Sequence, residues 1–133
     1  MSEVSSIVLF AADPTRTIAF YRALGVNLEE EDHGDGVLHA ATDVGDVHFA
    51  VFPGSDDAGA EPPAPGWRAS GGTFVGFYVP SLADAVESIC AHGSRLLVEH
   101  QVCDWGRRVI AKDPGGRAVE INQRGHCRAG ADA

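Results

Sequence analysis

Glu120 is the residue of this sequence best placed to do chemistry, because it is a carboxylate on the polar side of an apolar strand. It lies near the end of Trp105 to Asn122, a stretch that reads as a strand, a tight turn and a second strand. Successive side chains of a strand point to opposite faces, so Val119 and Ile121 face the core and Glu120 faces away from it. A partly desolvated carboxylate in that place could pair with a cationic or hydrogen-bonding group of a ligand, or act as a general base.

Other residues with chemical potential have simpler interpretations. Glu120 itself could form a purely structural salt bridge to Arg107 or Arg108. Cys103 lies beside Asp104 but has no adjacent histidine to act as a base, so we expect an ordinary thiol. His33 and His39 lie in or near predicted turns, and the other histidines without a strand position show no partner spacing, namely His92, His100 and His126. All five are expected to be exposed.

Length and charge restrict the class of protein. The chain has 133 residues and a formal net charge of -9, which fits one domain and argues against nucleic acid as a partner. Its three cysteines show no C-x-x-C spacing, so we expect reduced thiols and a cytoplasmic location. Nothing near Met1 resembles a signal peptide, and no apolar run approaches the roughly 20 residues of a membrane span.

The elements that position Glu120 begin with a strand predicted at Ser5 to Phe10. Asp13-Pro14 then predicts the start of a helix, because Asp is a good N-cap and Pro suits the first helical position; Gly25 predicts its end. Three strands are predicted to follow, near Asn27 to Asp32, Val37 to Thr42 and Asp46 to Phe52.

The same order of elements returns after Pro53 to Gly72, a Pro- and Gly-rich segment that we interpret as a linker. Thr73 to Val79 predicts a strand, and Ser81 caps a helix that ends at Gly93. The apolar stripe predicted to be buried on that helix consists of Leu82, Val86, Ile89 and Cys90. The last three strands are predicted near Arg95 to Val102, Arg107 to Lys112 and Arg117 to Asn122.

The repeat predicts an α+β fold built from two βαβββ modules. We place module one at residues 4–53, the linker at 54–72, module two at 73–123 and a frayed tail at 124–133. Each helix covers one face of its own sheet, which leaves the opposite faces to be buried against each other or around a ligand.

The sequence resembles the vicinal oxygen chelate superfamily, which includes glyoxalase I, bleomycin resistance proteins and extradiol dioxygenases. The resemblance rests on Ile7 to Gly25, on Phe77 to Ala85, and above all on Trp105-Gly106-Arg107-Arg108 through Asp113-Pro114-Gly115-Gly116 to Glu120. It implies that the two modules form paired, curled mixed sheets around a shared cleft. It also implies a homodimer, with the modules paired within one chain or exchanged between two chains.

Metal-dependent members of the superfamily place ligands on the first and last strand of each module. The matching positions here are Ser6, Ala50, Phe74 and Glu120. Only Glu120 could bind a metal, whereas a divalent ion needs about three nitrogen or oxygen ligands. We therefore expect no metal cofactor, and a divalent metal held with help from His48 is the alternative.

Side chains on the faces turned away from the helices would line the cleft. The predicted ligand-binding residues are Ser6, Val8, Phe10, His48, Ala50, Phe52, Phe74, Tyr78, Glu120 and Asn122. This lining suits a small molecule with a flat apolar body, held in orientation by a few polar groups. Some of the aromatic rings could instead simply fill the cleft.

The function predicted first is a metal-free protein of the bleomycin-resistance type that sequesters or carries a hydrophobic, aromatic or cationic small molecule, as in antibiotic resistance. The alternative is an enzyme, a lyase, isomerase or dioxygenase, that uses Glu120 with a rebuilt metal site or as a metal-free general base. A third possibility is a cleft that serves in assembly alone. Fold analogy does not separate these functions.

Overall fold

The computed structural model describes residues 1–31, 39–54 and 73–125, and it contains the two predicted βαβββ modules. Module one consists of β1 (Ser6–Ala11), α1 (Pro14–Ala23), β2 (Glu29–Glu31), β3 (His39–Val44) and β4 (Val47–Pro53). Module two consists of β5 (Phe74–Tyr78), α2 (Leu82–Ala91), β6 (Arg95–Cys103), β7 (Gly106–Lys112) and β8 (Ala118–Arg124). The α+β class and the repeated order of elements are therefore confirmed.

The boundaries of the linker and the tail stay predictions. Of the predicted linker, residues 55–72 lie outside the described residues, as do residues 126–133 of the predicted tail. Strand β8 continues to Arg124, one residue into the predicted tail, and its backbone pairs with the start of β7.

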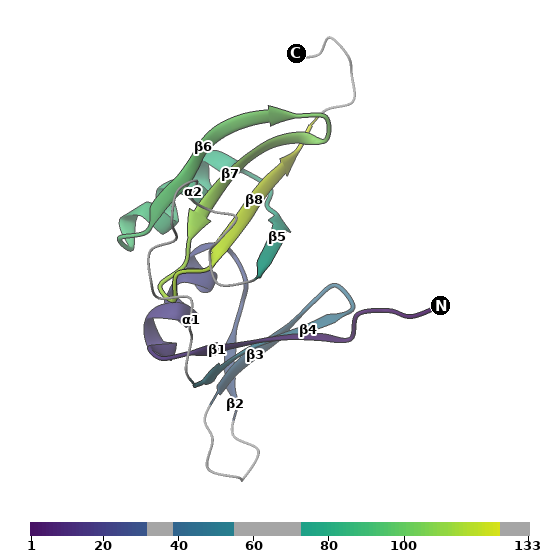
Figure 1. Cartoon of the computed structure of the whole chain (residues 1–133), viewed down its shortest axis with the longest axis vertical. Coiled ribbons are helices and arrows are strands. Elements are labelled where there is room, and N and C mark those ends of the chain that lie inside the picture. Colours follow the sequence, from purple (N-terminus) through teal and green to yellow (C-terminus); the bar gives the residue numbers. More distant parts are fainter. Residues whose placement is uncertain (32–38, 55–72, 126–133) are drawn as a thin grey trace.

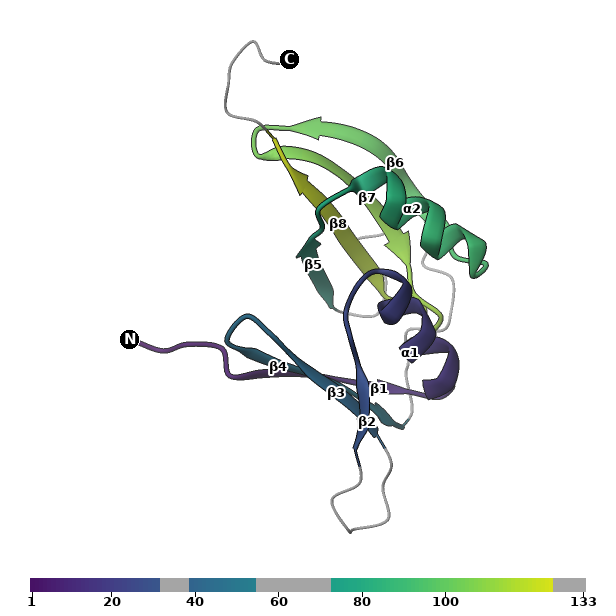
Figure 2. The ribbon, with the colours of Figure 1, turned by 180° about the vertical axis from the view of Figure 1, so that it is seen from behind.

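Each module forms one four-stranded mixed sheet. The strand orders are β1-β4-β3-β2 and β5-β8-β7-β6, and in each sheet the first and last strands of the module lie side by side in parallel. The two sheets share no strand pairing and splay apart, so they do not close on one another (Figure 1). Both helices lie on the same side of the molecule, with α1 packed on β1 and β4 and α2 packed on β7 and β8 (Figure 2).

Local sequence signals fix the helix ends as predicted. Asp13 caps α1 by accepting a hydrogen bond from the backbone N of Arg16 at 3.2 Å, and Pro14 follows at the first helical position. Gly25, at φ 102°, adopts the left-handed conformation that ends the helix. Ser81 caps α2 in the same way as Asp13 caps α1, through the backbone N of Asp84 at 3.2 Å.

The modules meet through an aromatic cluster in the core. The Phe77 ring of module two lies 6.0 Å from the Tyr21 ring and 5.7 Å from the Phe49 ring, both in module one. Tyr21 and Phe49 are almost fully buried. This contact holds the modules against one another on the side of the helices.

Two sequence predictions about burial are wrong. Cys90 is exposed, and Ala85 takes its place in the buried stripe with Leu82 and Ile89. Cys90 lies about 100° further round the helix than Ile89, which turns it out of the stripe. His39, expected to be exposed, is buried at 5% exposure.

Within the described ranges, no helix is long and apolar enough to cross a membrane.

Candidate functional site

The turn between β7 and β8 is organised around Asp113. Its Oδ1 accepts hydrogen bonds from the backbone N of Gly115 at 2.9 Å and of Arg117 at 3.0 Å, which fixes the tight turn predicted between the two strands. Its Oδ2 accepts from the Tyr21 hydroxyl at 2.7 Å and from Arg117 Nη1 at 3.2 Å. Arg117 also donates to the backbone carbonyl of Phe10. The turn that starts β8 is thus fixed to α1 and β1 of the other module.

The buried Tyr21 hydroxyl serves this link as a neutral donor. Burial raises the pKa of Tyr21 well above its ordinary value, and the negative charge and hydrogen bond of Asp113 raise this pKa further. The positive charge of Arg117 lowers the pKa of Tyr21, but by less than these two causes raise it. Tyr21 therefore keeps its proton and acts as a structural tie between the modules.

Glu120 lies on β8 and both of its carboxylate oxygens have partners. Oε2 lies 2.7 Å from Arg108 Nη1, and the two side chains are only 17% and 20% exposed, respectively. Oε1 accepts a hydrogen bond from Asn122 Nδ2 at 3.0 Å. Of the interpretations that the sequence leaves open, the ion pair with Arg108 is the one that the structure contains.

Neighbouring side chains hold this arrangement in place. Trp105 Nε1 donates to Asn122 Oδ1 at 2.8 Å, which leaves the amide nitrogen of Asn122 to face Glu120. Arg108 Nε donates to Gln101 Oε1 at 2.9 Å. The Glu120 carboxylate is therefore part of a network that extends over β6, β7 and β8.

Gly76 provides the space that the Glu120 carboxylate occupies. The two residues are register partners in the parallel β5–β8 pair. A Cβ atom at position 76 would lie 2.7 Å from Glu120 Oε1, closer than such atoms approach in proteins. An alanine here would therefore displace the end of the Glu120 side chain, and the role of Gly76 is close approach, since its φ is not positive.

Aromatic side chains surround this network on the same face of the second sheet. Phe74 and Tyr78 flank Gly76 along β5, and both are more than 40% exposed. The Arg124 guanidinium lies 3.7 Å from the centroid of the Tyr78 ring, and the Arg108 guanidinium lies 5.9 Å from that of Trp105. This face therefore offers apolar rings together with two arginines, of which one is neutralised by Glu120.

The other predicted ligand-binding residues form a separate group on the first sheet. They face one another as register pairs between β1 and β4, namely Ser6 with His48, Val8 with Ala50 and Phe10 with Phe52. Val8 and Phe10 are exposed, whereas Ala50 is buried at 1% exposure between its strand neighbours. His48 bonds Asp43 at 2.9 Å, and the buried His39 ring stacks on Phe52 at 4.0 Å between centroids.

The structure thus brings the predicted site residues together in two half-sites, one on each sheet. The half-site on the first sheet consists of Ser6, Val8, Phe10, His48, Ala50 and Phe52, and that on the second sheet consists of Phe74, Tyr78, Glu120 and Asn122. The splayed sheets of a single chain do not bring the half-sites into one closed cleft (Figure 1). Two pockets, of about 420 and 470 Å³, are lined entirely by residues outside both half-sites.

The residues at the four ligand positions do not fit a divalent metal. Both Glu120 oxygens are engaged by Arg108 and Asn122, and the side chains of Ala50 and Phe74 carry no nitrogen or oxygen atom that could bind a metal. Over residues 1–31, 39–54 and 73–125, no group of three or more histidine, cysteine, aspartate or glutamate residues is arranged to hold a metal ion. An arginine at 2.7 Å from the carboxylate occupies the place where a cation would bind.

Sequence reasoning named Arg108, with Arg107, as a possible salt-bridge partner of Glu120, but it did not predict the contacts that Trp105 and Gly76 make with this network. The signal for Arg108 was present in the hairpin, since the turn at Asp113 fixes the register and places Arg108 opposite Asn122, diagonal to Glu120. Trp105 has no such signal, because its contact depends on the side-chain orientation of Asn122.

Comparisons with known proteins agree with this architecture. The fold is similar to that of the genomically encoded fosfomycin resistance protein FosX from Listeria monocytogenes, with a TM-score of 0.66 and 19% identity, covering 100% of this chain and 99% of that one. It is also similar to TnmS3, an antibiotic binding protein from Streptomyces sp. CB03234, with a TM-score of 0.63 and 17% identity over 94% of this chain and 98% of that one. A glyoxalase family protein from Enterococcus faecalis gives a TM-score of 0.60 and 22% identity over 90% and 96% of the two chains.

At these identities the structural likeness shows the fold alone, and no curated protein sequence matches the chain. The family follows from a sequence model. The model of the Glyoxalase/Bleomycin resistance protein/Dioxygenase superfamily matches residues 3–121, nearly the whole of the 133-residue chain. The chain belongs to this superfamily.

Proposed function

We propose that the protein is a metal-free binding protein for a small hydrophobic or aromatic molecule. The observation that carries this proposal is the engagement of both Glu120 oxygens, one by Arg108 at 2.7 Å and one by Asn122 at 3.0 Å. The Arg108 cation already balances the charge of this carboxylate, which disfavours a metal ion beside it. General-base catalysis by Glu120, the alternative, would first require the ion pair with Arg108 to open.

The chemistry of the second-sheet half-site favours a flat apolar ligand. Phe74, Tyr78 and Trp105 present exposed ring surface, and stacking on such rings contributes affinity beyond the burial of area. The ion pair removes the reason to expect a cationic ligand, because the Glu120 charge is already balanced by Arg108. Arg124, stacked on Tyr78, adds a positive charge at the edge of this surface, which suits an aromatic ligand that is neutral or carries an acidic group.

A second copy of the chain would complete the cleft. Val8 and Phe10 on the first sheet and Phe74 and Tyr78 on the second sheet are exposed, and the two sheets splay apart. Two apolar faces on one chain suit a two-fold dimer, in which the first sheet of one copy covers the second sheet of the other and forms two equal clefts. Each cleft would then contain both half-sites.

A ligand screen by thermal shift tests the binding function. Antibiotics and aromatic metabolites are the first compounds to screen, given that FosX from Listeria monocytogenes is described as a fosfomycin resistance protein and TnmS3 as an antibiotic binding protein. A bound ligand raises the melting temperature by mass action, and the increase should fall in Phe74→Ala and Tyr78→Ala. Val102→Ala is the matched control, because Val102 is exposed on β6 outside both half-sites.

The screen also has an outcome that rejects the proposal. A ligand whose stabilising effect survives Phe74→Ala, Tyr78→Ala and Glu120→Ala together would bind elsewhere. Turnover of a substrate that is lost in Glu120→Gln, with binding retained, would instead establish the enzymatic alternative.

A further inference from the structure

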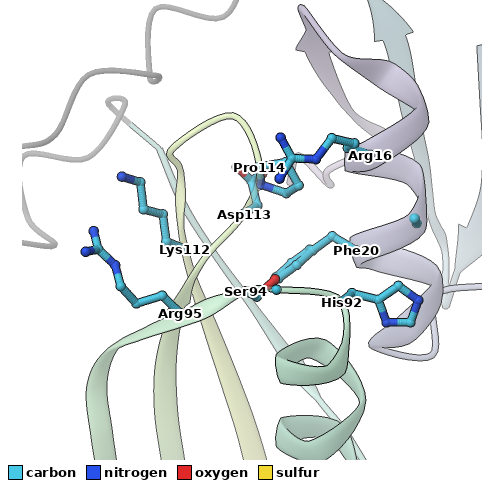
Figure 3. Close-up of a pocket in the computed structure, with 10 residues that line it drawn as sticks. Arg16, Phe20, His92, Ser94, Arg95, Lys112, Asp113 and Pro114 are labelled. Atoms are coloured by element: carbon cyan, nitrogen blue, oxygen red, sulfur yellow. The ribbon is translucent and has the colours of Figure 1, made fainter.

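Two pockets lie outside both half-sites, and they differ in their lining. The pocket of about 420 Å³ lies between α1 and the turn at Asp113, and its residues Arg95 and Lys112 already interact with other groups of the chain (Figure 3). The pocket of about 470 Å³, here called the α2–β6 pocket, lies between α2 and the second sheet. Its volume falls within the roughly 300–1,000 Å³ typical of sites for small molecules.

The α2–β6 pocket exists because the helix covers only part of its sheet. Helix α2 lies across the second sheet (Figure 2) and packs on β7 and β8, whereas β6 is the edge strand. Leu82 and Val86 of α2 line one side of the pocket, and Leu96 of β6 and Val109 of β7 line the other. Leu82 and Val109 are buried in the core, whereas Val86 and Leu96 are only partly buried. The pocket therefore has an apolar floor at the margin of the core, which an apolar group of a ligand would cover.

An irregularity in β6 adds polar side chains to this floor. Two register shifts interrupt the pairing of β6 with β7, and the second leaves Glu99 and His100 together opposite the single residue Val109. Adjacent residues of a regular strand point to opposite faces, whereas a bulge redirects them. Glu99 and His100 both line the pocket. The bulge thus brings a carboxylate and an imidazole to the same apolar floor.

Side chains of opposite charge surround the pocket. Glu87 comes from α2, Glu99 from β6 and Arg107 from β7, and all three residues are exposed. Within residues 1–31, 39–54 and 73–125, none of these three side chains forms an ion pair or a hydrogen bond. Two carboxylates and one guanidinium are therefore available to a ligand in this pocket.

The hydrogen-bond donors and the carboxylates lie at different positions along the pocket. Arg107 and Gln123 are register partners on β7 and β8, so their side chains share one face of the sheet. Gln123 Oε1 accepts a hydrogen bond from the backbone N of Leu82 at 2.8 Å, which places this pair beside the start of α2. Glu99 lies opposite Val109, two residues further along β7 than Arg107. A ligand with two charged groups can therefore meet the guanidinium at one position and a carboxylate at the next.

We propose that the α2–β6 pocket binds a small zwitterion with an apolar body, of the kind of an amino acid with an apolar side chain. The carboxylate of the ligand binds Arg107, whose guanidinium can donate two parallel hydrogen bonds to it. The ammonium group of the ligand binds Glu99 and Glu87, and its apolar side chain covers the floor. A simple amine would leave Arg107 without a partner, and a simple carboxylate would leave both glutamates without one. The site is independent of the function proposed above, because it shares no residue with either half-site.

The test measures the binding of leucine to the full chain by calorimetry and by thermal shift. Because leucine would bind the folded chain and not the unfolded one, we expect a saturable rise in melting temperature. Three compounds each lack one part of the ligand: 3-methylbutylamine lacks the carboxylate, 4-methylpentanoate lacks the ammonium group and glycine lacks the apolar body. Each should bind about tenfold or more weakly than leucine.

Two variants of the pocket and two matched controls locate the binding. Arg107→Gln and Glu99→Gln should each weaken leucine binding about tenfold or more, the loss expected for one charge-assisted contact. Arg16→Gln and Glu30→Gln remove the same charges from exposed residues outside the pocket, and should leave leucine binding unchanged. The melting temperature without leucine shows that each variant is folded.

Three results would overturn the proposal. The first is the absence of a saturable response to leucine. The second is binding of 3-methylbutylamine or 4-methylpentanoate as tight as that of leucine, which would mean that one of the two charges is not recognised. The third is equal weakening by the control variants, which would reduce the effect to net charge. Loss of an aromatic ligand in Phe74→Ala would reject neither this site nor its ligand, because Phe74 lies outside the pocket.

Discussion

Glu120 and Arg108 form an ion pair of 2.7 Å between neighbouring strands, at a position that the family resemblance predicts for a metal ligand. Both side chains are about four-fifths covered, so neither charge is fully solvated. The carboxylate is thereby used to hold β7 and β8 together beside Trp105. This relationship leads to the first prediction.

Purified protein should contain no stoichiometric divalent metal, as measured by elemental analysis without prior use of a chelator. Because the arginine already balances the carboxylate, added zinc, nickel or manganese should leave the melting temperature unchanged. Arg108→Ala should destabilise the fold by about 2–3 kcal/mol, since it leaves a mostly buried carboxylate without its cation. One equivalent of metal that disappears in Glu120→Ala would show that the metal-free interpretation is wrong.

Gly76→Ala should lower the free energy of unfolding by about 1–3 kcal/mol, because the new methyl group would lie 2.7 Å from Glu120 Oε1 and must displace the carboxylate. The double variant Gly76→Ala/Glu120→Ala removes the obstructing atom, so it should cost less than the sum of the single changes. Urea unfolding of the four proteins measures this coupling. Additive effects would mean that the methyl group meets something other than Glu120.

Stability should fall above about pH 10 through Tyr21. The folded-state pKa of Tyr21 lies above the unfolded value of about 10, so the unfolded chain loses this proton at lower pH than the folded chain. The contribution of protonated Tyr21 to the free energy of unfolding is fully present below about pH 10. It decreases as pH rises toward the folded-state pKa, by up to about 1.4 kcal/mol per pH unit.

Urea unfolding of the wild type and of Tyr21→Phe across this pH range isolates the effect. Tyr21→Phe should be less stable by about 1–2 kcal/mol near neutral pH, because Asp113 loses a donor. Above about pH 10 its free energy of unfolding should fall less steeply with pH than that of the wild type. Tyr78→Phe, which removes an exposed hydroxyl group, should keep the wild-type slope. Equal slopes for all three proteins would contradict the raised pKa.

Light scattering after size exclusion should give twice the mass of the 14.0 kDa chain. Phe10→Glu or Phe74→Glu should dissociate the dimer, since each places a charge on an apolar face that we expect the second copy to cover. Val102→Glu adds the same charge to a valine that is 79% exposed elsewhere on the second sheet, and should leave the dimer intact. A monomeric wild type would reject the dimer and the completed cleft with it.

Local signals predicted the fold well, and contacts between elements account for what they missed. Asp13-Pro14, Ser81 and the turn at Asp113 act within a few residues of sequence, and the structure contains each of them as predicted. Cys90 was misplaced because adjacent residues of a short helix differ by about 100° in direction. His39 depends on the Phe52 ring from a neighbouring strand, and the partner of Glu120 depends on side-chain geometry, neither of which periodicity specifies.

The hydrogen bond between Tyr21 and Asp113 spans 92 positions of the chain. During synthesis the first module leaves the ribosome long before Asp113 does. Over that interval the Tyr21 hydroxyl group has no Asp113 carboxylate to accept its hydrogen bond. The nascent first module also lacks the Phe77 ring that covers Tyr21 and Phe49. Because a contact this distant in sequence forms late, the first half should remain loosely packed until Asp113 has been synthesised, and should depend on chaperones during that interval.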